Sequence, residues 1–124
     1  MASSLTQQEK SLTDLLKLLS NPTRLSIFQL LMTGAHCNCE LAEILGLSLS
    51  LVSHHLHLMT ESGLVKAQRD DQDARWIHFS IDTGSLTILR DLFWQTTDPA
   101  NMQDRTPACI QKRSLVVEIT ETTK

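Results

Sequence analysis

The chain has 124 residues, three cysteines and a formal net charge of −3 at pH 7. This length suits one domain, and a 41% apolar content is typical of a globular protein rather than a disordered one. An odd cysteine count argues against a disulfide framework, and no apolar run is long enough to cross a bilayer. Because the polar start does not resemble a signal peptide, we expect a cytoplasmic protein with no membrane contact. The negative charge excludes a basic field over the whole surface, so any DNA binding must come from a local patch.

Two helices are predicted in the first third of the chain. In residues 6–19, Thr6 and Glu9 have the spacing of a capping box. The leucines that follow at helical period are Leu12, Leu15, Leu16 and Leu19. Asn21 suits the N-cap of a second helix and Pro22 its first position, because proline lacks the N–H that would be unpaired there. The predicted buried face of this second helix comprises Leu25, Phe28, Leu31 and Met32, and Gly34 is expected to follow its end.

The next two elements have the dimensions of a helix-turn-helix. A short helix is predicted over roughly residues 39–45, with Leu41, Ala42 and Leu45 facing inward. Gly46 breaks it, and Ser48 is expected to cap a longer helix that runs to about residue 62. A short helix, a glycine turn and a longer helix together are typical of this DNA-binding unit.

A β-hairpin and a last helix are predicted next. Residues 64–69 and 75–81 are rich in β formers and enclose a polar turn, residues 70–74. A helix follows over residues 82–95, and residues 98–124 form a polar tail that carries Cys109 and a possible strand at 115–119. The predicted fold is mainly α with a small hairpin wing, a winged helix-turn-helix of order ααααββα. One domain covers residues 1–97, and the tail covers residues 98–124.

The longer helix of the helix-turn-helix carries the clearest functional pattern. Its apolar face, Val52, Leu56 and Met59, fits the core, and His55 is expected to be packed and hydrogen-bonded. Short polar groups and imidazoles on the other side can reach base edges or phosphates in a major groove. The candidate DNA-binding residues there are Ser48, Ser50, Ser53, His54 and His57. A simple solvated helix face is the alternative. Leu49 and Leu51 are expected to pack against the preceding helix or to contact thymine methyl groups.

Basic residues flank the predicted hairpin at Lys66, Arg69 and Arg75. Three aspartates occupy its tip, and like charge should keep that tip away from phosphates. Arg69 and Arg75, at the base of the wing, are therefore the candidate phosphate-binding residues. Binding of this kind should weaken steeply with salt.

Four segments together resemble the ArsR/SmtB family of winged-helix repressors. Residues 18–25, Leu-Leu-Ser-Asn-Pro-Thr-Arg-Leu, resemble the opening signature of that family, and residues 37–41, Cys-Asn-Cys-Glu-Leu, resemble its metal box. Residues 53–56 and 61–65 resemble its recognition helix and wing entry, and residues 75–79 its second wing strand. The resemblance implies a repressor, not an enzyme, and the chain also lacks a phosphate-binding glycine loop or a nucleophile arranged with a base.

The resemblance further implies a homodimer, built on the first and last helices, that binds double-stranded operator DNA. The implied interface residues are Leu12, Leu16, Leu19, Leu86, Leu89 and Phe93. Two recognition helices would then enter successive major grooves ~34 Å apart.

Cys37 and Cys39 are the candidate ligands of an effector ion that releases the DNA. Thiolates are soft ligands, and the candidate ions are As(III), Sb(III), Cd(II), Pb(II), Zn(II) and Cu(I), with As(III) and Sb(III) favoured. Arsenic sensors of the family often carry a third cysteine where this chain has Ala42. Cys109, from either protomer, is the only other thiol, and His36 is an adjacent nitrogen ligand. The last helix contains no histidine, which argues against the zinc site that other family members carry there.

The spacing of the two cysteines makes a mechanical prediction. Residues two apart on an ideal helix point about 200° away from each other. One ion can therefore bind both sulfurs only if this turn is unwound or lies outside the helix. We expect ion capture to pull the start of the third helix out of its DNA-competent geometry. The alternatives are that the cysteines are small buried residues, or that the same fold senses oxidants through a strained Cys37–Cys39 disulfide.

Overall fold

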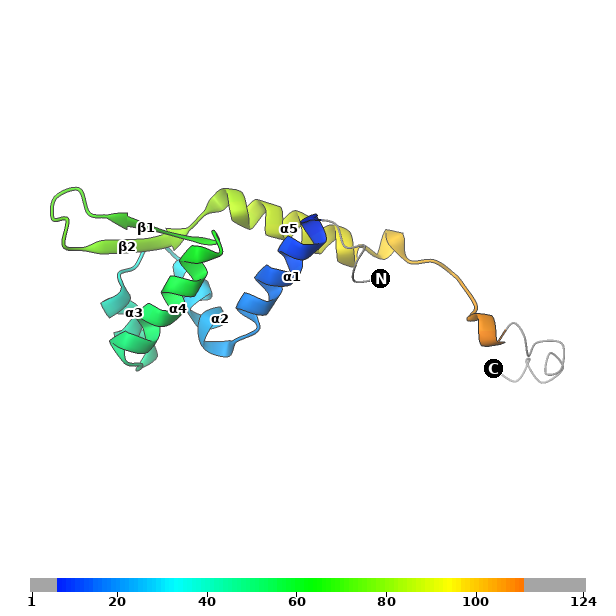
Figure 1. The fold of residues 1–124 in the computed structure, drawn as a ribbon, viewed down its shortest axis with the longest axis horizontal. Coiled ribbons are helices and arrows are strands. Elements are labelled where there is room, and N and C mark those ends of the chain that lie inside the picture. The colour runs from blue at the N-terminus through cyan, green and yellow to red at the C-terminus, as the bar shows by residue number, and fades with distance from the viewer. Residues whose placement is uncertain (1–6, 111–124) are drawn as a thin grey trace.

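The computed structural model describes residues 7–110, and their side chains from residue 11 onward. The elements in chain order are α1 (Gln7–Leu19), α2 (Pro22–Leu31), α3 (Asn38–Leu45), α4 (Leu49–Glu61), β1 (Val65–Arg69), β2 (Ile77–Ile81), α5 (Thr83–Thr97) and the 3-10 turn η2 (Pro99–Asn101) (Figure 1). This is the predicted order of four helices, a hairpin and a last helix. The predicted capping role of Thr6 and the possible strand at 115–119 lie outside the described residues.

Local capping signals set the helix boundaries. The side chain of Asn21 accepts hydrogen bonds from the backbone N–H groups of Thr23 and Arg24 at 2.9 and 3.1 Å, with Pro22 in the first turn, as predicted. Gly46 ends α3 with a φ of 67°, a left-handed conformation that side chains disfavour. Ser48 then caps α4 by accepting from the N–H of Leu51 at 3.1 Å. The two helices of the helix-turn-helix are thus fixed at their junction.

The buried face of α2 agrees in part with the predicted one. Leu31 is buried and Phe28 packs against the core as predicted, whereas Leu25 and Met32 are 40% and 53% exposed and Ile27 is buried instead. Both sides of this helix are apolar, so periodicity alone does not identify the side that the core covers. The structure turns Ile27 and Leu31 toward α4 and leaves Met32 beside α5.

The core consists of two adjoining clusters. The larger one joins α2, α3, α4 and the hairpin through Ile27, Leu31, Leu41, Ala42, Val52, Leu56, Met59, Val65 and Ile81. The smaller one, Leu12, Leu15, Leu64 and Leu89, packs α1 and α5 against the start of the wing. The predicted apolar face of α4 is therefore confirmed, and its packing fixes which side of α4 faces out.

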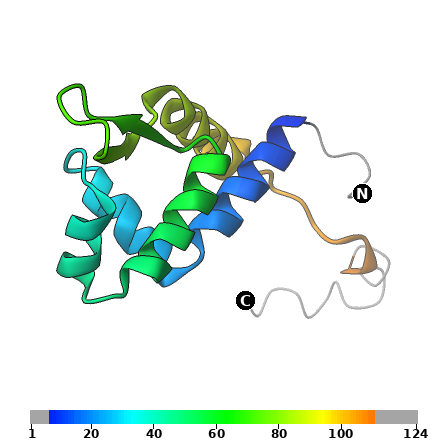
Figure 2. The ribbon, with the colours of Figure 1, turned by 60° about the vertical axis from the view of Figure 1, so that its left-hand side comes forward.

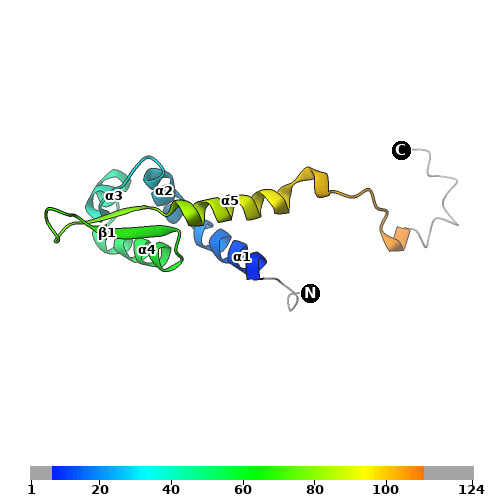
Figure 3. The same cartoon turned by 90° about the horizontal axis from the view of Figure 1, so that it is seen from above.

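The wing is an antiparallel hairpin with Val65 opposite Ile81 and Arg69 opposite Ile77. Its tight turn is held by Asp70, whose carboxylate accepts from the backbone of Gln72 and Asp73 and contacts Nε2 of His78 at 3.0 Å. The wing projects beyond the helices at one end of the molecule (Figures 1 and 3). A polar, tightly turned tip of this kind is the part of the hairpin furthest from the core.

Helices α1 and α5 lie beside each other on the side away from α3, as the turned view shows (Figure 2). Their outer surfaces are unusually apolar: Leu16 is 43%, Ile88 56%, Phe93 46% and Trp94 72% exposed. Within the described part of the chain, no helix combines the length and apolar character that crossing a bilayer requires.

Candidate DNA-recognition face and thiolate pair

Helix α4 turns a polar face outward from the core. Ser50 and His54 are exposed near its N-terminal end, and Ser53 is half-buried between them and α3. These three side chains occupy the part of a second helix that contacts base edges in helix-turn-helix complexes. The structure thus groups them as the sequence predicts.

Two further candidates on this helix are exposed but already have partners. Ser48 uses its Oγ as the N-cap acceptor, and its hydroxyl proton stays available to a phosphate. His57 contacts Glu61 one turn later, at 3.4 Å between Nε2 and Oε2. Because Glu61 is acidic, DNA would compete with it for the His57 imidazole.

His55 is buried, as predicted, and receives the guanidinium of Arg24. Arg24 Nη1 lies 3.4 Å from Nδ1 of His55, and Arg24 Nε donates to the carbonyl of Leu18 at 2.6 Å. Burial, with the neighbouring Arg24 charge, lowers the pKa of His55, so the neutral ring is the favoured partner. Arg24 therefore links the end of α1 to the recognition helix, a role that its place in the sequence signature does not reveal.

Leu49 and Leu51 lie at the start of α4, outside the core cluster that α3 and α4 share. They are 51% and 40% exposed, whereas Val52 beside Leu51 is fully buried. The alternative expectation, contact with thymine methyl groups, is compatible with this exposure.

The two wing arginines are held at the base of the hairpin turn. Arg75 forms a bidentate pair with Asp73, with Nε and Nη2 at 3.0 and 2.7 Å from the two carboxylate oxygens. This pairing lowers the pKa of Asp73 and raises that of Arg75. Arg69 donates to the carbonyl of Ala74 at 2.7 Å. Arg75 thus has an internal anion that a DNA phosphate would have to replace.

Cys37 and Cys39 meet at the beginning of α3. Cys37 is the N-cap, with extended backbone angles of −89° and 164°, so the helix begins one residue earlier than predicted, at Asn38. The two Sγ atoms lie 2.9 Å apart. Of the two arrangements expected, an unwound turn or a turn outside the helix, the structure has the second: Cys37 is the N-cap, outside the helix, and the sulfurs meet while α3 is regularly wound.

A capping box holds this arrangement. The backbone N–H of Cys37 donates to Oε1 of Glu40 at 2.9 Å, and the Cys37 sulfur receives the N–H of Glu40 in return. The pKa of Glu40 is lowered, chiefly by the hydrogen bond from Cys37. Burial raises the pKa of Cys37, and the hydrogen bond with the Cys39 sulfur raises it further. Cys37 must therefore lose its proton to bind an ion.

A third ligand is not assembled beside the pair. Among residues 7–110 no group of three His, Cys, Asp or Glu side chains has metal-binding geometry. Ala42, the position of the family's third cysteine, is buried in the core. His36 directs Nδ1 to the carbonyl of Gly34 at 2.8 Å. Cys109 is exposed, in the segment that leads away from α3 at the far end of α5 (Figures 1 and 3).

Asn38, between the two cysteines, has a contact that the sequence does not indicate. Its Nδ2 donates to Oγ of Ser53 on α4 at 3.1 Å. The two residues are 15 positions apart, so local patterns cannot pair them; only a polar residue in the middle of the metal box hints at a role.

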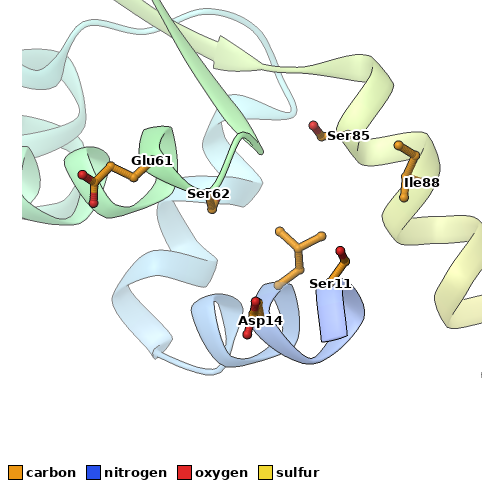
Figure 4. Close-up of a pocket in the computed structure, with 7 residues that line it drawn as sticks. Ser11, Asp14, Glu61, Ser62, Ser85 and Ile88 are labelled. Carbon is orange, nitrogen blue, oxygen red and sulfur yellow. The ribbon is translucent and has the colours of Figure 1, made fainter. Parts of the chain in front are cut away.

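A surface cavity of about 380 Å³ opens elsewhere, between α1, the end of α4 and the start of α5 (Figure 4). Asp14, Glu61, Ser11, Ser62 and Ser85 supply its polar lining. Its lining contains carboxylates and hydroxyls without a histidine or cysteine, so it does not pair a nucleophile with an imidazole base.

Comparison with known proteins identifies the family. The family model "Bacterial regulatory protein, arsR family" matches residues 21–67, from α2 into β1. The chain is 38% identical over 61 residues to the arsenical resistance operon repressor of Staphylococcus xylosus, a match that covers 49% of this chain and 59% of that protein. It is 30% identical over 80 residues to the transcriptional repressor SdpR of Bacillus subtilis, covering 64% of this chain and 82% of that protein.

A solved structure agrees along nearly its whole length. It is the crystal structure of a possible transcriptional regulator for arsenical resistance, with a TM-score of 0.61 and 31% identity, covering 73% of this chain and 98% of that one. The chain belongs to the arsR family. This arsR-family chain has the predicted winged helix-turn-helix fold. Its functional class is also the predicted one, a regulator of transcription rather than an enzyme.

Proposed function

We propose that this arsR-family protein is a dimeric repressor that leaves its operator DNA when a thiophilic ion binds Cys37 and Cys39. The observation that carries the proposal is the 2.9 Å separation of the two sulfurs at the start of the first helix of the helix-turn-helix. An ion held there sits within the DNA-reading unit itself. Binding of the ion can therefore change the DNA affinity locally, without a conformational change transmitted across the molecule.

The outward face of α4 supports DNA binding. Ser50, Ser53 and His54 offer donors and acceptors to base edges, and the exposed Arg69 and Arg75 can supply cations to phosphates at the wing. Ser48 and His57 lie at the edges of the same face. Since the whole chain is acidic, these local groups must supply the electrostatic part of the binding.

The surface of α1 and α5 supports a homodimer. An apolar groove of about 400 Å³ lies between α1, α2 and α5 and is lined by Leu16, Phe28, Met32, Leu86, Leu89, Arg90 and Phe93. A large exposed apolar surface of this kind marks an interaction site. A second copy placed on this surface would cover Leu16 and Phe93 of the interface that the family resemblance implies, whereas Leu12 and Leu89 of that interface are buried in the core of the protomer.

The chemistry of the pair determines the class of effector. Thiolates favour As(III), Sb(III), Cd(II), Pb(II) or Zn(II) over hard cations. Arsenical resistance appears in the names of the staphylococcal relative and of the similar solved structure. The trigonal ions As(III) and Sb(III) would take a third sulfur. Cys109 of the partner protomer is the candidate, because residues 98–110 of one protomer lead away from its own pair (Figure 1).

The proposal is tested with DNA selected by the protein from a random duplex library. We expect tight, salt-sensitive binding of the selected duplex, and its release by arsenite, antimonite or cadmium but not by magnesium. Retention of the duplex at saturating concentrations of all the thiophilic ions would overturn the proposal.

A redox sensor of the same fold is the second candidate, favoured by the same proximity of the sulfurs. Hydrogen peroxide would oxidise the two thiols to a disulfide and be reduced to two waters. Closing the 2.9 Å gap to the ~2.05 Å of a disulfide would strain a loop this short. Release of DNA by peroxide, with no response to any thiophilic ion, would favour this candidate.

A further inference from the structure

The thiolate pair is connected to the recognition helix by one side chain. Asn38 lies between Cys37 and Cys39 and is the first residue of α3. Its Nδ2 donates to Oγ of Ser53 at 3.1 Å, in a partly buried position between α3 and α4. Ser53 in turn lies on the face of α4 that is turned toward DNA.

The other side of the cysteine pair is anchored to the wing. His36 exchanges two backbone hydrogen bonds with Phe79 of β2, His36 N to Phe79 O at 3.0 Å and Phe79 N to His36 O at 2.8 Å. Two backbone bonds are harder to displace than one side-chain bond. When the sulfurs adjust to an ion, residues 37–39 will therefore move more easily on the α4 side than at His36.

We propose that Asn38 is a positioning residue that transmits ion binding at Cys37 and Cys39 to Ser53. In the free protein its amide holds the Ser53 hydroxyl in the orientation used on DNA. The sulfurs lie 2.9 Å apart, whereas two sulfurs bound tetrahedrally to one ion at about 2.3 Å each would lie ~3.8 Å apart. An ion therefore pushes the two sulfurs apart, the first turn of α3 shifts, the Asn38–Ser53 bond breaks and α4 loses its alignment with α3. This inference rests on the proposed function and names the contact through which it acts.

The test compares wild type, Asn38→Ala and Asn38→Asp with cadmium as the ion. Asn38→Ala removes the bond to Ser53, whereas an aspartate can keep it by accepting the proton of the Ser53 hydroxyl. For each protein, cadmium binding is followed by thiolate-to-metal absorbance, and the affinity for the selected duplex is measured with and without cadmium. The coupling is the ratio of the DNA affinity without cadmium to the DNA affinity with cadmium. An effect of the added aspartate charge that is the same with and without cadmium cancels in this ratio.

We expect Asn38→Ala to bind cadmium as wild type does, to bind DNA about fivefold more weakly without the ion, and to lose about the same factor from its coupling. Asn38→Asp should retain most of the coupling. Ser53→Ala should reduce the coupling as Asn38→Ala does, and the double variant should add no further loss of coupling. Ser53→Ala can also remove a direct contact between Ser53 and DNA. If that contact has the same strength with and without cadmium, its loss cancels in the coupling.

Full coupling in Asn38→Ala, with wild type responding to cadmium, would overturn this inference and leave the proposed function intact. Loss of coupling in Asn38→Ala through loss of cadmium absorbance would also overturn it, because Asn38 would then act on ion binding. A wild-type protein that binds no cadmium, or that keeps its DNA when cadmium is bound, would overturn both.

Discussion

The Sγ atoms of Cys37 and Cys39 lie 2.9 Å apart, with Cys37 as the extended N-cap of α3 and Cys39 in its first turn. The same backbone is held by the capping box with Glu40 and, through Asn38, by Ser53 of α4. A ligand for the sulfurs therefore acts on a backbone segment that these two contacts fix at the start of α3.

Replacing either cysteine of the pair should separate ion response from DNA binding. Cys37→Ser and Cys39→Ser should keep DNA affinity, and serine remains a good N-cap at position 37. Affinity for cadmium or arsenite should fall by more than about tenfold, because a hydroxyl is a poor ligand for a soft ion. Fluorescence anisotropy of labelled duplex during ion titration measures both. With cadmium as the ion, Cys109→Ser is the matched control; with arsenite it should weaken binding too, because Cys109 is the proposed third sulfur. A serine at 37 or 39 with undiminished response would contradict the assignment.

Ion affinity should increase with pH. The raised pKa of Cys37 means that this thiol is protonated at neutral pH, and an ion must displace the proton to bind. Below that pKa, cadmium affinity should rise by up to about tenfold per pH unit for each proton released. Titrations between pH 6 and 8 with absorbance detection test this. An affinity independent of pH would show that the Cys37 sulfur is already a thiolate or is not a ligand.

His54→Ala should weaken binding of the selected duplex by about 1–3 kcal/mol and relax the base preference at one position. His54 is exposed on the outward face of α4, so its loss should not affect folding. Competition binding against single-base variants of the duplex measures the effect. Thr96→Ala, on the exposed surface of α5, is the control, and an unchanged base preference in His54→Ala would remove this residue from the reading face.

Asp73→Asn should strengthen DNA binding. The substitution releases Arg75 from its bidentate pair and removes one negative charge from the wing. If Arg75 then contacts a phosphate, the slope of log affinity against log salt should steepen by about one. Arg75→Ala alone should have a smaller effect than Arg69→Ala, since Arg75 is already neutralised by Asp73. Equal salt slopes in wild type and Asp73→Asn would place Arg75 away from DNA.

Stability should fall as the pH drops below the ordinary pKa of histidine, 6.5, because the pKa of His55 is lowered in the folded protein. In that range the unfolded chain takes up a proton that the folded chain does not, so stability decreases with decreasing pH until the folded His55 also protonates. His55→Gln, whose amide oxygen can still accept from Arg24, should flatten this dependence. Denaturant midpoints between pH 8 and 5 measure it. Parallel curves for the two proteins would exclude His55 as the cause.

Much of the fold could be predicted because its signals are local. Asn21, Ser48 and Gly46 act within their own turns, and the hairpin is indicated by two runs of β formers on either side of a polar turn. The buried side of α2 could not be predicted, because Ile27 and Met32 are both apolar and only tertiary packing distinguishes them.

The candidate site was predictable in its residues but not in its connections. The contact of the two sulfurs depends on Cys37 being the N-cap, and the sequence leaves open whether this turn is unwound or lies outside the helix. The bonds of Asn38 to Ser53 and of Arg24 to His55 join residues 15 and 31 positions apart, and no periodic pattern indicates such contacts.

The central claim, that an ion on Cys37 and Cys39 releases DNA, is tested most directly by one titration with two simultaneous signals. Cadmium is added to the complex with labelled duplex while thiolate absorbance and DNA anisotropy are recorded together. We predict that absorbance rises and anisotropy falls over the same range of cadmium, with both changes absent in the Cys37→Ser variant. Full thiolate absorbance with the duplex still bound would contradict the account.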